Sequence, residues 1–85
     1  MSGSKIVGIT FSESHLQALL EDRRIVSTPL AWYPTLVRLS AKERGAYHLI
    51  GAGRGVEWES IDYQISLEGM LRGIPEAGAI VPVTN

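Results

Sequence analysis

Cysteine is absent from the 85-residue sequence, which excludes disulfide bonds, thiolate metal sites and cysteine nucleophiles. An excess of one charge is also lacking, because eight lysines and arginines stand against nine acidic residues and leave a formal net charge of −1. That balance argues against nucleic acid or an anionic membrane surface as the partner of this domain alone. No apolar run approaches the roughly 20 residues that span a bilayer, and no secretory signal opens the chain. We therefore expect a cytoplasmic protein without a membrane anchor.

Apolar residues are not in short supply. They make up 45% of the chain, an ordinary share for a folded globular protein. At this length they suffice for one small core, so we expect a single domain over residues 1–74. Residues 75–85 form a tail of glycine, proline, alanine and valine, which either frays or adds residues 79–83 as an edge strand.

Two segments near the start of the chain alternate between apolar and polar residues, the period of a half-buried strand. In residues 5–11 the alternation places Val7, Ile9 and Phe11 on one face. Residues 16–20 repeat it after a short polar turn. The pair predicts an antiparallel β-hairpin.

A third strand is expected after a charged turn at residues 21–24. Residues 25–28 are β-branched in three of four positions, and Pro29 cannot donate a hydrogen bond to a ladder. The strand therefore ends at Pro29 or lies at an edge. A three-stranded sheet with an unpaired edge offers a surface for self-association by β-augmentation.

The period then changes to that of short helices. Pro34 suits the first turn of a helix, where its missing N–H costs nothing, and residues 36–39 supply an apolar face. Ser40 and Glu43 have the spacing of a capping box. This spacing predicts a second helical turn at residues 41–44.

The last third of the chain predicts a further hairpin and one more helix. Residues 47–50 and 56–58 look extended, and the glycine-rich residues 51–55 join them. Ser66 and Gly73 have the positions of a helix N-cap and of the residue that ends a helix. The expected fold is thus a small α+β domain: a three-stranded antiparallel sheet, short helices and a further β-hairpin.

No catalytic or metal-binding set stands out in the sequence. The glycines of residues 51–55 lead into a strand rather than a helix, which favours a hairpin turn over a phosphate loop. His15 and His48 are isolated and lack the spacing of a metal-ligand pair. Glu57 and Glu59 fall on one face of the expected strand, where acidic side chains are more often solvated than catalytic. We therefore expect no enzymatic activity, no metal and no cofactor.

Aromatic and arginine side chains gather in the middle of the chain, and such residues dominate binding hot spots. The candidate contact surface consists of Trp32, Tyr33, Arg38, Arg44 and Trp58. The alternative is that the tryptophans pack the core, which a small domain needs, and core packing is the favoured interpretation. Arg44 has a structural alternative too, an ion pair with Glu43 or Asp62.

The same block carries an ordered series of motifs. They are Leu30-Ala31-Trp32-Tyr33-Pro34-x-Leu36, Glu43-Arg44, Gly53-x-Gly55-Val56-x-Trp58, Ile61-Asp62 and Ile65-Ser66-Leu67-Glu68-Gly69-Met70-Leu71-x-Gly73. In this series the chain resembles the bacterial family called domain of unknown function 2442. Two departures are visible. Asp22-Arg23-Arg24 stands where the family usually has Asp-Gly-Arg, so an arginine takes the place of a turn glycine. The acidic run that the family usually has after the second tryptophan is reduced to Asp62-Tyr63-Gln64.

The resemblance implies a small α+β domain without established catalytic residues. Genes of the family often lie beside a short gene of another uncharacterised family, which implies a toxin–antitoxin-like or regulatory pair. The leading hypothesis is therefore a non-enzymatic interaction or regulatory module, antitoxin-like, that binds a protein partner or itself. The alternative is a small-molecule or peptide-binding domain, with an aromatic groove between the sheet and residues 34–44.

Overall fold

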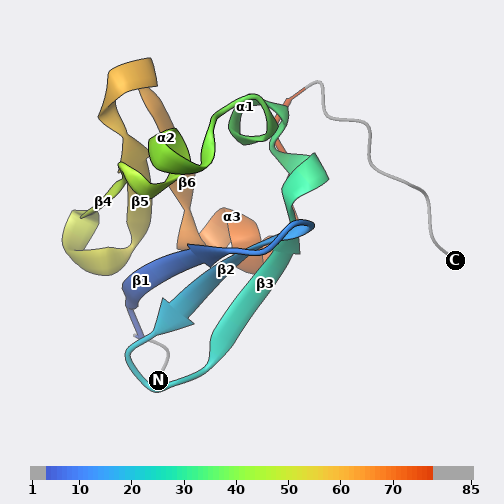
Figure 1. Cartoon of the computed structure of the whole chain (residues 1–85). Coiled ribbons are helices and arrows are strands. Elements are labelled where there is room, and N and C mark those ends of the chain that lie inside the picture. Colours follow the sequence, from blue (N-terminus) through green and yellow to red (C-terminus); the bar gives the residue numbers. More distant parts are fainter. Residues whose placement is uncertain (1–3, 78–85) are drawn as a thin grey trace, which may run out of the picture.

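The computed structural model of the chain describes residues 4–77, and its elements form two three-stranded antiparallel sheets with short helices between and after them (Figure 1). Sheet A has the strand order β1-β2-β3 and sheet B the order β4-β5-β6. The predicted strand at residues 79–83 lies outside the described residues. The elements, with η for 3-10 turns, are β1 (Ile6–Phe11), β2 (His15–Leu20), β3 (Ile25–Pro29), η1 (Leu30–Trp32), α1 (Pro34–Val37), α2 (Ala41–Gly45), β4 (His48–Ile50), η2 (Gly51–Gly53), β5 (Gly55–Trp58), η3 (Glu59–Ile61), β6 (Tyr63–Ser66) and α3 (Leu67–Arg72).

The three predicted strands of sheet A are confirmed, and Ile9 and Phe11 face the core as predicted, but Val7 does not share their side. Ile6 and Ile9 are buried, whereas Val7 is 47% exposed. The cause is an irregularity in the β1–β2 register between Ile6 and Gly8. Such a bulge adds one residue to a strand and reverses the side on which the following side chains lie. Phe11 keeps its predicted orientation and packs partly buried against the core.

The turn between β2 and β3 remains tight although arginine replaces the glycine. Arg23 has φ 79°, in the left-handed region, and its N–H donates to the carbonyl of Leu20 at 2.9 Å. Asp22 holds the turn by accepting hydrogen bonds from the backbone N–H and Nε of Arg24 at 3.0 and 2.7 Å, and from Ser4 Oγ at 2.7 Å. The carboxylate of Asp22 thus stabilises a conformation that the arginine itself disfavours.

The helix signals in the sequence are confirmed. Pro34 occupies the first position of α1. At α2, Ser40 Oγ accepts from the N–H of Glu43 at 3.1 Å, and the Glu43 carboxylate accepts from the N–H of Ser40 at 2.8 Å. At α3, Ser66 Oγ accepts from the N–H of Gly69 at 2.9 Å, and Gly73 ends that helix with φ 72°.

Sheet B has one strand more than the predicted hairpin. β6 pairs with β5 from Gly55–Ser66 to Trp58–Tyr63, and its last residue also caps α3. Four residues are too short for their alternation to stand out in the sequence. The placement of Glu57 and Glu59 on one strand face is wrong, because β5 ends at Trp58 and Glu59 begins η3.

One hydrophobic core joins both sheets and α3. In Figure 1, α3 lies over the inner face of sheet A, and sheet B stands beside it, with α1 and α2 crossing above. The largest fully buried side chains come from β1, β2, α1 and β5: Ile6, Leu16, Leu36, Val56 and Trp58. Both sheets therefore contribute to the same packed interior.

Candidate functional site

The five residues of the predicted contact surface do not share one surface. Trp58 is 1% exposed and Tyr33 2% exposed, so both belong to the core, which was the favoured interpretation for the tryptophans. Trp32 is half-buried, Arg38 is exposed and Arg44 is half-buried. The prediction that these residues contact a partner therefore narrows to Trp32, Arg38 and Arg44.

Trp58 occupies the seam between the two sheets. Its Nε1–H donates to the backbone carbonyl of Arg44 at 2.9 Å, which satisfies the one polar atom of the buried indole. Three aromatic rings surround it, those of Phe11, Tyr47 and Tyr63, with centroids 6.5, 6.4 and 5.9 Å away. A side chain held on all sides in this way serves packing rather than recognition.

Arg44 fixes the end of a helix rather than pairing with an acidic residue. Its Nε donates to the carbonyl of Leu36 at 2.9 Å, and its Nη2 donates to that of Val37 at 3.1 Å. These carbonyls lie at the end of α1, where a cation is favourable. The predicted ion pair with Glu43 or Asp62 is wrong: among residues 4–77, the ion pairs do not include Arg44.

Trp32 remains partly accessible, and the segment that passes its indole at Gly73 carries two exposed apolar residues. An added Cβ at Gly73 would lie 3.7 and 3.9 Å from Cη2 and Cζ3 of the indole, so the ring covers that glycine. On either side of Gly73, Leu71 is 61% exposed and Ile74 55% exposed. We call Trp32, Leu71 and Ile74 the Trp32 patch.

The sequence interpretation missed Leu71 and Ile74, although a signal for Leu71 was present. α3 buries Leu67 and Met70, which lie three residues apart on one helix face. Leu71 falls outside that face and must point elsewhere. The position of Ile74 depends on the path of the chain after Gly73, which no local pattern reveals.

Glu76 ties the segment beside the patch to the domain. Its carboxylate accepts hydrogen bonds from the Tyr63 hydroxyl at 2.6 Å and from the Thr35 hydroxyl and N–H at 2.8 and 3.2 Å. Its own N–H donates to the carbonyl of Trp32 at 2.9 Å. Burial alone would raise the pKa of Glu76, but the hydrogen bonds from Tyr63 and Thr35, helped by the charge of Arg38, outweigh it and lower the pKa. Burial, and then the adjacent Glu76 carboxylate, raises the pKa of Tyr63.

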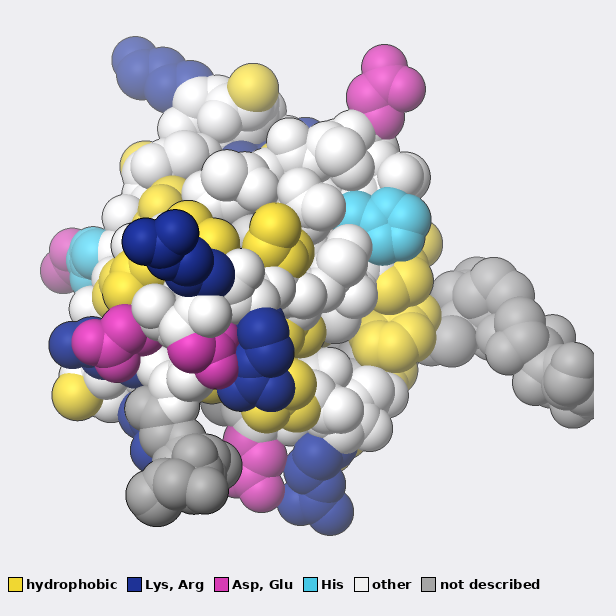
Figure 2. All heavy atoms as spheres, turned by 90° about the horizontal axis from the view of Figure 1, so that it is seen from below, with side chains coloured by type: hydrophobic (Ala, Val, Ile, Leu, Met, Phe, Trp, Pro, Cys, Tyr) yellow, Lys and Arg dark blue, Asp and Glu magenta, His cyan; other side chains and the backbone are white. Residues whose placement is uncertain are grey.

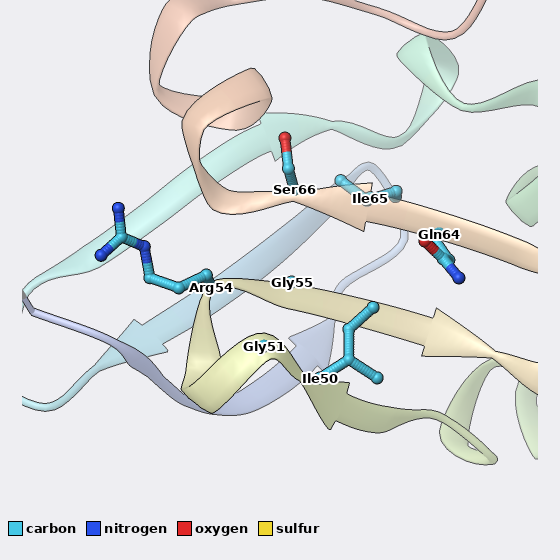
Figure 3. A pocket seen from close by; sticks show the side chains of 7 residues that line it. All are labelled: Ile50, Gly51, Arg54, Gly55, Gln64, Ile65 and Ser66. Carbon is cyan, nitrogen blue, oxygen red and sulfur yellow. The ribbon is translucent and has the colours of Figure 1, made fainter.

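A hollow of about 410 Å³ lies over the outer face of sheet B (Figure 3). Its floor is Gly55, with Ile50 on one side and Ser66 on the other. Arg54 and Gln64 lie at opposite ends of the hollow, and the Arg54 side chain extends away from Gln64. Their polar groups therefore do not converge on one point. This divergence makes the hollow a poor template for a small polar ligand.

A polar row continues the outer face of sheet B from this hollow. Glu57 accepts hydrogen bonds from Gln64 Nε2 at 3.1 Å and lies 3.1 Å from His48 Nε2. The hydrogen bond from Gln64, followed by that from His48, lowers the pKa of Glu57. All three side chains come from adjacent strands of one solvent-facing surface.

A second hollow, of about 620 Å³, lies between β1 and α2. It is lined by Ile9, Thr10, Phe11, Ser12, Glu13, Ala41, Arg44 and Gly45. The guanidinium carbon of Arg44 lies 5.9 Å from the centre of the Phe11 ring, within cation–π range. A groove was expected between the sheet and residues 34–44, but its lining differs from the tryptophans and Tyr33 that were proposed.

Among residues 4–77, no three histidine, aspartate or glutamate side chains are grouped so as to hold a metal ion. Nor does that part of the chain contain a helix with the length and apolar character needed to cross a membrane.

Comparison with known proteins finds a matching family and a solved structure of similar fold. A family model described as protein of unknown function (DUF2442) matches residues 6–76. The crystal structure of a protein of unknown function from Rhodospirillum rubrum ATCC 11170 is similar, with a TM-score of 0.76 and 22% sequence identity. The similarity covers 92% of this chain and 96% of that one. No curated protein matches the sequence.

Proposed function

The chain belongs to the DUF2442 family of proteins of unknown function, and from this premise we propose that it is a non-enzymatic interaction module of an antitoxin-like or regulatory kind. Its partner is a protein, bound through the Trp32 patch. The neighbouring short gene common in this family supports the antitoxin-like form of the proposal. The observation that carries the proposal is the exposure of Leu71 and Ile74 on either side of Gly73, the residue that the Trp32 indole covers.

The chemistry of the patch suits a protein partner. Single exposed apolar side chains are ordinary, but here two lie within three residues of each other, in the segment whose Gly73 is covered by an indole. Burying a leucine or isoleucine side chain contributes about 1.5–3 kcal/mol, which a partner can recover on binding. Arg38 stands near the patch through its contact with Thr35, which in turn bonds Glu76. An apolar centre with arginine at its rim is the usual anatomy of a binding hot spot.

The polar clusters support a non-enzymatic role. General acid–base catalysis at neutral pH is most efficient with a group whose pKa lies near 7. The pKa values of Glu57 and Glu76 are both lowered, away from that range. Each carboxylate is also engaged by hydrogen bonds from within the domain, which favours a structural role for both.

The test is co-expression of the chain with the product of the adjacent gene, followed by affinity purification and titration. We expect association at micromolar concentration, and a weakening of about thirtyfold for Leu71→Asp, the change typical of losing a hot spot of about 2 kcal/mol. Val7→Asp is the matched control, because Val7 is also an exposed apolar residue, 47% exposed, but lies in β1 and outside the Trp32 patch. Failure to associate, or equal weakening by both substitutions, contradicts the proposal.

The hollow between β1 and α2 favours a second candidate, a peptide-binding or small-molecule-binding domain. Its volume of about 620 Å³ and the Arg44–Phe11 pair at its wall are the specific observations. Ala41→Trp fills this hollow from the exposed start of α2. Binding that Ala41→Trp abolishes and Leu71→Asp spares would assign recognition to the hollow instead of the Trp32 patch.

A further inference from the structure

Sheet A has two edge strands, and the edge of β1 is covered. The hydroxyl of Tyr47 accepts a hydrogen bond from the N–H of Ile9 at 3.0 Å and donates to its carbonyl at 3.4 Å. Nearer the start of β1, Gly53 packs so closely that an added Cβ would lie 2.6 Å from Lys5 Cβ and 3.0 Å from the Ile6 carbonyl oxygen. A side chain and a turn thus occupy the outer side of this strand.

The edge of β3 has a different environment. The N–H of Leu20 donates to the carbonyl of Arg24, which makes Leu20 and Arg24 a hydrogen-bonded pair. In an antiparallel ladder every second residue belongs to such a pair, so the next residues of β3 that bond to β2 are Val26 and Thr28. Ile25 and Ser27 therefore point their N–H and carbonyl groups away from β2. Within residues 4–77, no hydrogen bond reaches these outward groups. The strand offers unpaired donors and acceptors to an incoming strand.

We propose that β3 pairs antiparallel with β3 of a second copy of this chain, about a two-fold axis at Ser27, so that two copies of sheet A form one continuous sheet. In this register, Ser27 exchanges hydrogen bonds with Ser27 of the second copy. The N–H of Ile25 donates to the carbonyl of Pro29 of the second copy, and the reverse bond is made across the axis. About four new hydrogen bonds result, and Pro29 needs no acceptor because it has no N–H.

The lack of charge on β3 and the pattern of its side chains favour β3 of a second copy as the strand that pairs with this edge. The strand contains no charged residue, so a two-fold pairing brings no like charges face to face. On the open face, Thr10, Gln17 and Ser27 are aligned across the three strands. The axis at Ser27 continues this polar row into the same row of the second copy.

The proposed pairing also accommodates the exposed apolar side chain of Ile25. Ile25, which is 59% exposed, meets Pro29 of the second copy in this register and loses contact with water. Figure 2 views the molecule from below, the side on which sheet A lies, and shows its hydrophobic side chains in small groups among charged and polar ones. A surface of that kind suits pairing through a strand edge better than burial of a whole face.

Light scattering on the purified full chain, over a dilution series, tests the proposal. We expect a dimer that dissociates on dilution, and a monomer at all concentrations for Ser27→Pro. Proline removes only the outward N–H at this position, so the β2–β3 ladder and the circular dichroism spectrum are retained. Ser27→Ala keeps the N–H and must dimerise like the unchanged chain. A monomeric unchanged chain, or a folded Ser27→Pro dimer of equal strength, overturns the proposal.

Cross-linking gives a second measurement that does not depend on the folding of the proline variant. The chain has no cysteine, so Ser27→Cys introduces a single thiol. Hydrogen-bonded antiparallel partners lie about 5.5 Å apart at Cα, within the range of a disulfide. Mild oxidation should link Ser27→Cys into a covalent dimer and leave Thr10→Cys, on the far strand of the same face, largely monomeric. Equal cross-linking of the two variants contradicts pairing through β3.

The edge of β3, formed by Ile25, Ser27 and Pro29, shares no residue with the Trp32 patch. Leu71→Asp should therefore leave dimerisation unchanged, and Ser27→Pro should leave the affinity of the Trp32 patch unchanged. If a different protein requires the β3 edge while the chain alone stays monomeric, a second copy is the wrong occupant.

Discussion

Arg23 shows how one residue can hold a conformation that its type disfavours. A left-handed backbone costs an L-residue about 1–2 kcal/mol, and Arg23 has φ 79°. Glycine removes that strain but adds about 0.5–1 kcal/mol of chain entropy to be lost on folding. We expect Arg23→Gly to stabilise the domain by about 0.5–1 kcal/mol, which raises the Tm by a few degrees in thermal unfolding followed by circular dichroism.

Arg24 supplies the control for this turn. Its Nε donates to the Asp22 carboxylate at 2.7 Å, so Arg24→Gly removes a bond that holds the turn. It should lower the Tm. A lower Tm for Arg23→Gly as well would show that the arginine side chain contributes more than its backbone costs.

Glu76 makes the stability depend on pH in a direction that its hydrogen bonds determine. Its pKa in the folded protein is lowered from the ordinary 4.5, so the folded state binds this proton less readily than the unfolded chain. The stabilisation is present above pH 4.5 and is lost as the pH falls through the folded pKa. Glu76→Gln should be less stable than the unchanged chain at neutral pH, and the difference should shrink on acidification.

Urea unfolding of both proteins at several pH values measures this difference. The other carboxylates with lowered pKa values, Asp22, Glu43 and Glu57, are present in both proteins and cancel in the comparison. Tyr63→Phe removes the shortest bond to Glu76 and should bring part of the same loss. If the difference in unfolding free energy between the unchanged chain and Glu76→Gln does not vary with pH, the lowered pKa of Glu76 is not the cause of its stabilising effect.

At the scale of elements, η2 joins sheet B to the start of β1 through Gly53. The residue has φ 85°, and an added Cβ would come within 2.6 Å of Lys5 Cβ and 3.0 Å of a backbone oxygen. Gly51 also has positive φ, but its added Cβ would meet only Arg54 Cβ, at 3.7 Å. Gly51→Ala should therefore cost about 1 kcal/mol, whereas Gly53→Ala should cost at least about 2–3 kcal/mol because the sheets must also separate. Denaturant unfolding of the two variants checks the order, and equal losses would show that η2 does not clamp β1.

Some helices and strands could be predicted from the sequence and others could not. Helix ends follow from local chemistry, so Pro34, the Ser40–Glu43 box and the Ser66 cap were correctly interpreted from single motifs. The bulge between Ile6 and Gly8 and strand β6 depend on pairing with distant segments, and short alternation does not encode them. The Trp32 patch was predicted only in its indole, because the exposure of Leu71 and Ile74 depends on how α3 docks.

For the whole molecule, the common core predicts that both sheets unfold together. Leu36 is 0% exposed, and Trp58 lies at the seam with its N–H bonded to the carbonyl of Arg44. Leu36→Ala should cost about 2–5 kcal/mol, much of the stability of so small a domain. Tryptophan fluorescence reports Trp58 at the seam together with Trp32, and far-ultraviolet circular dichroism reports both sheets, so the two curves should coincide and shift together in the variant. Separate transitions would mean that one sheet keeps its structure when the seam is lost, and the Trp32 patch would then need only part of the fold to remain intact.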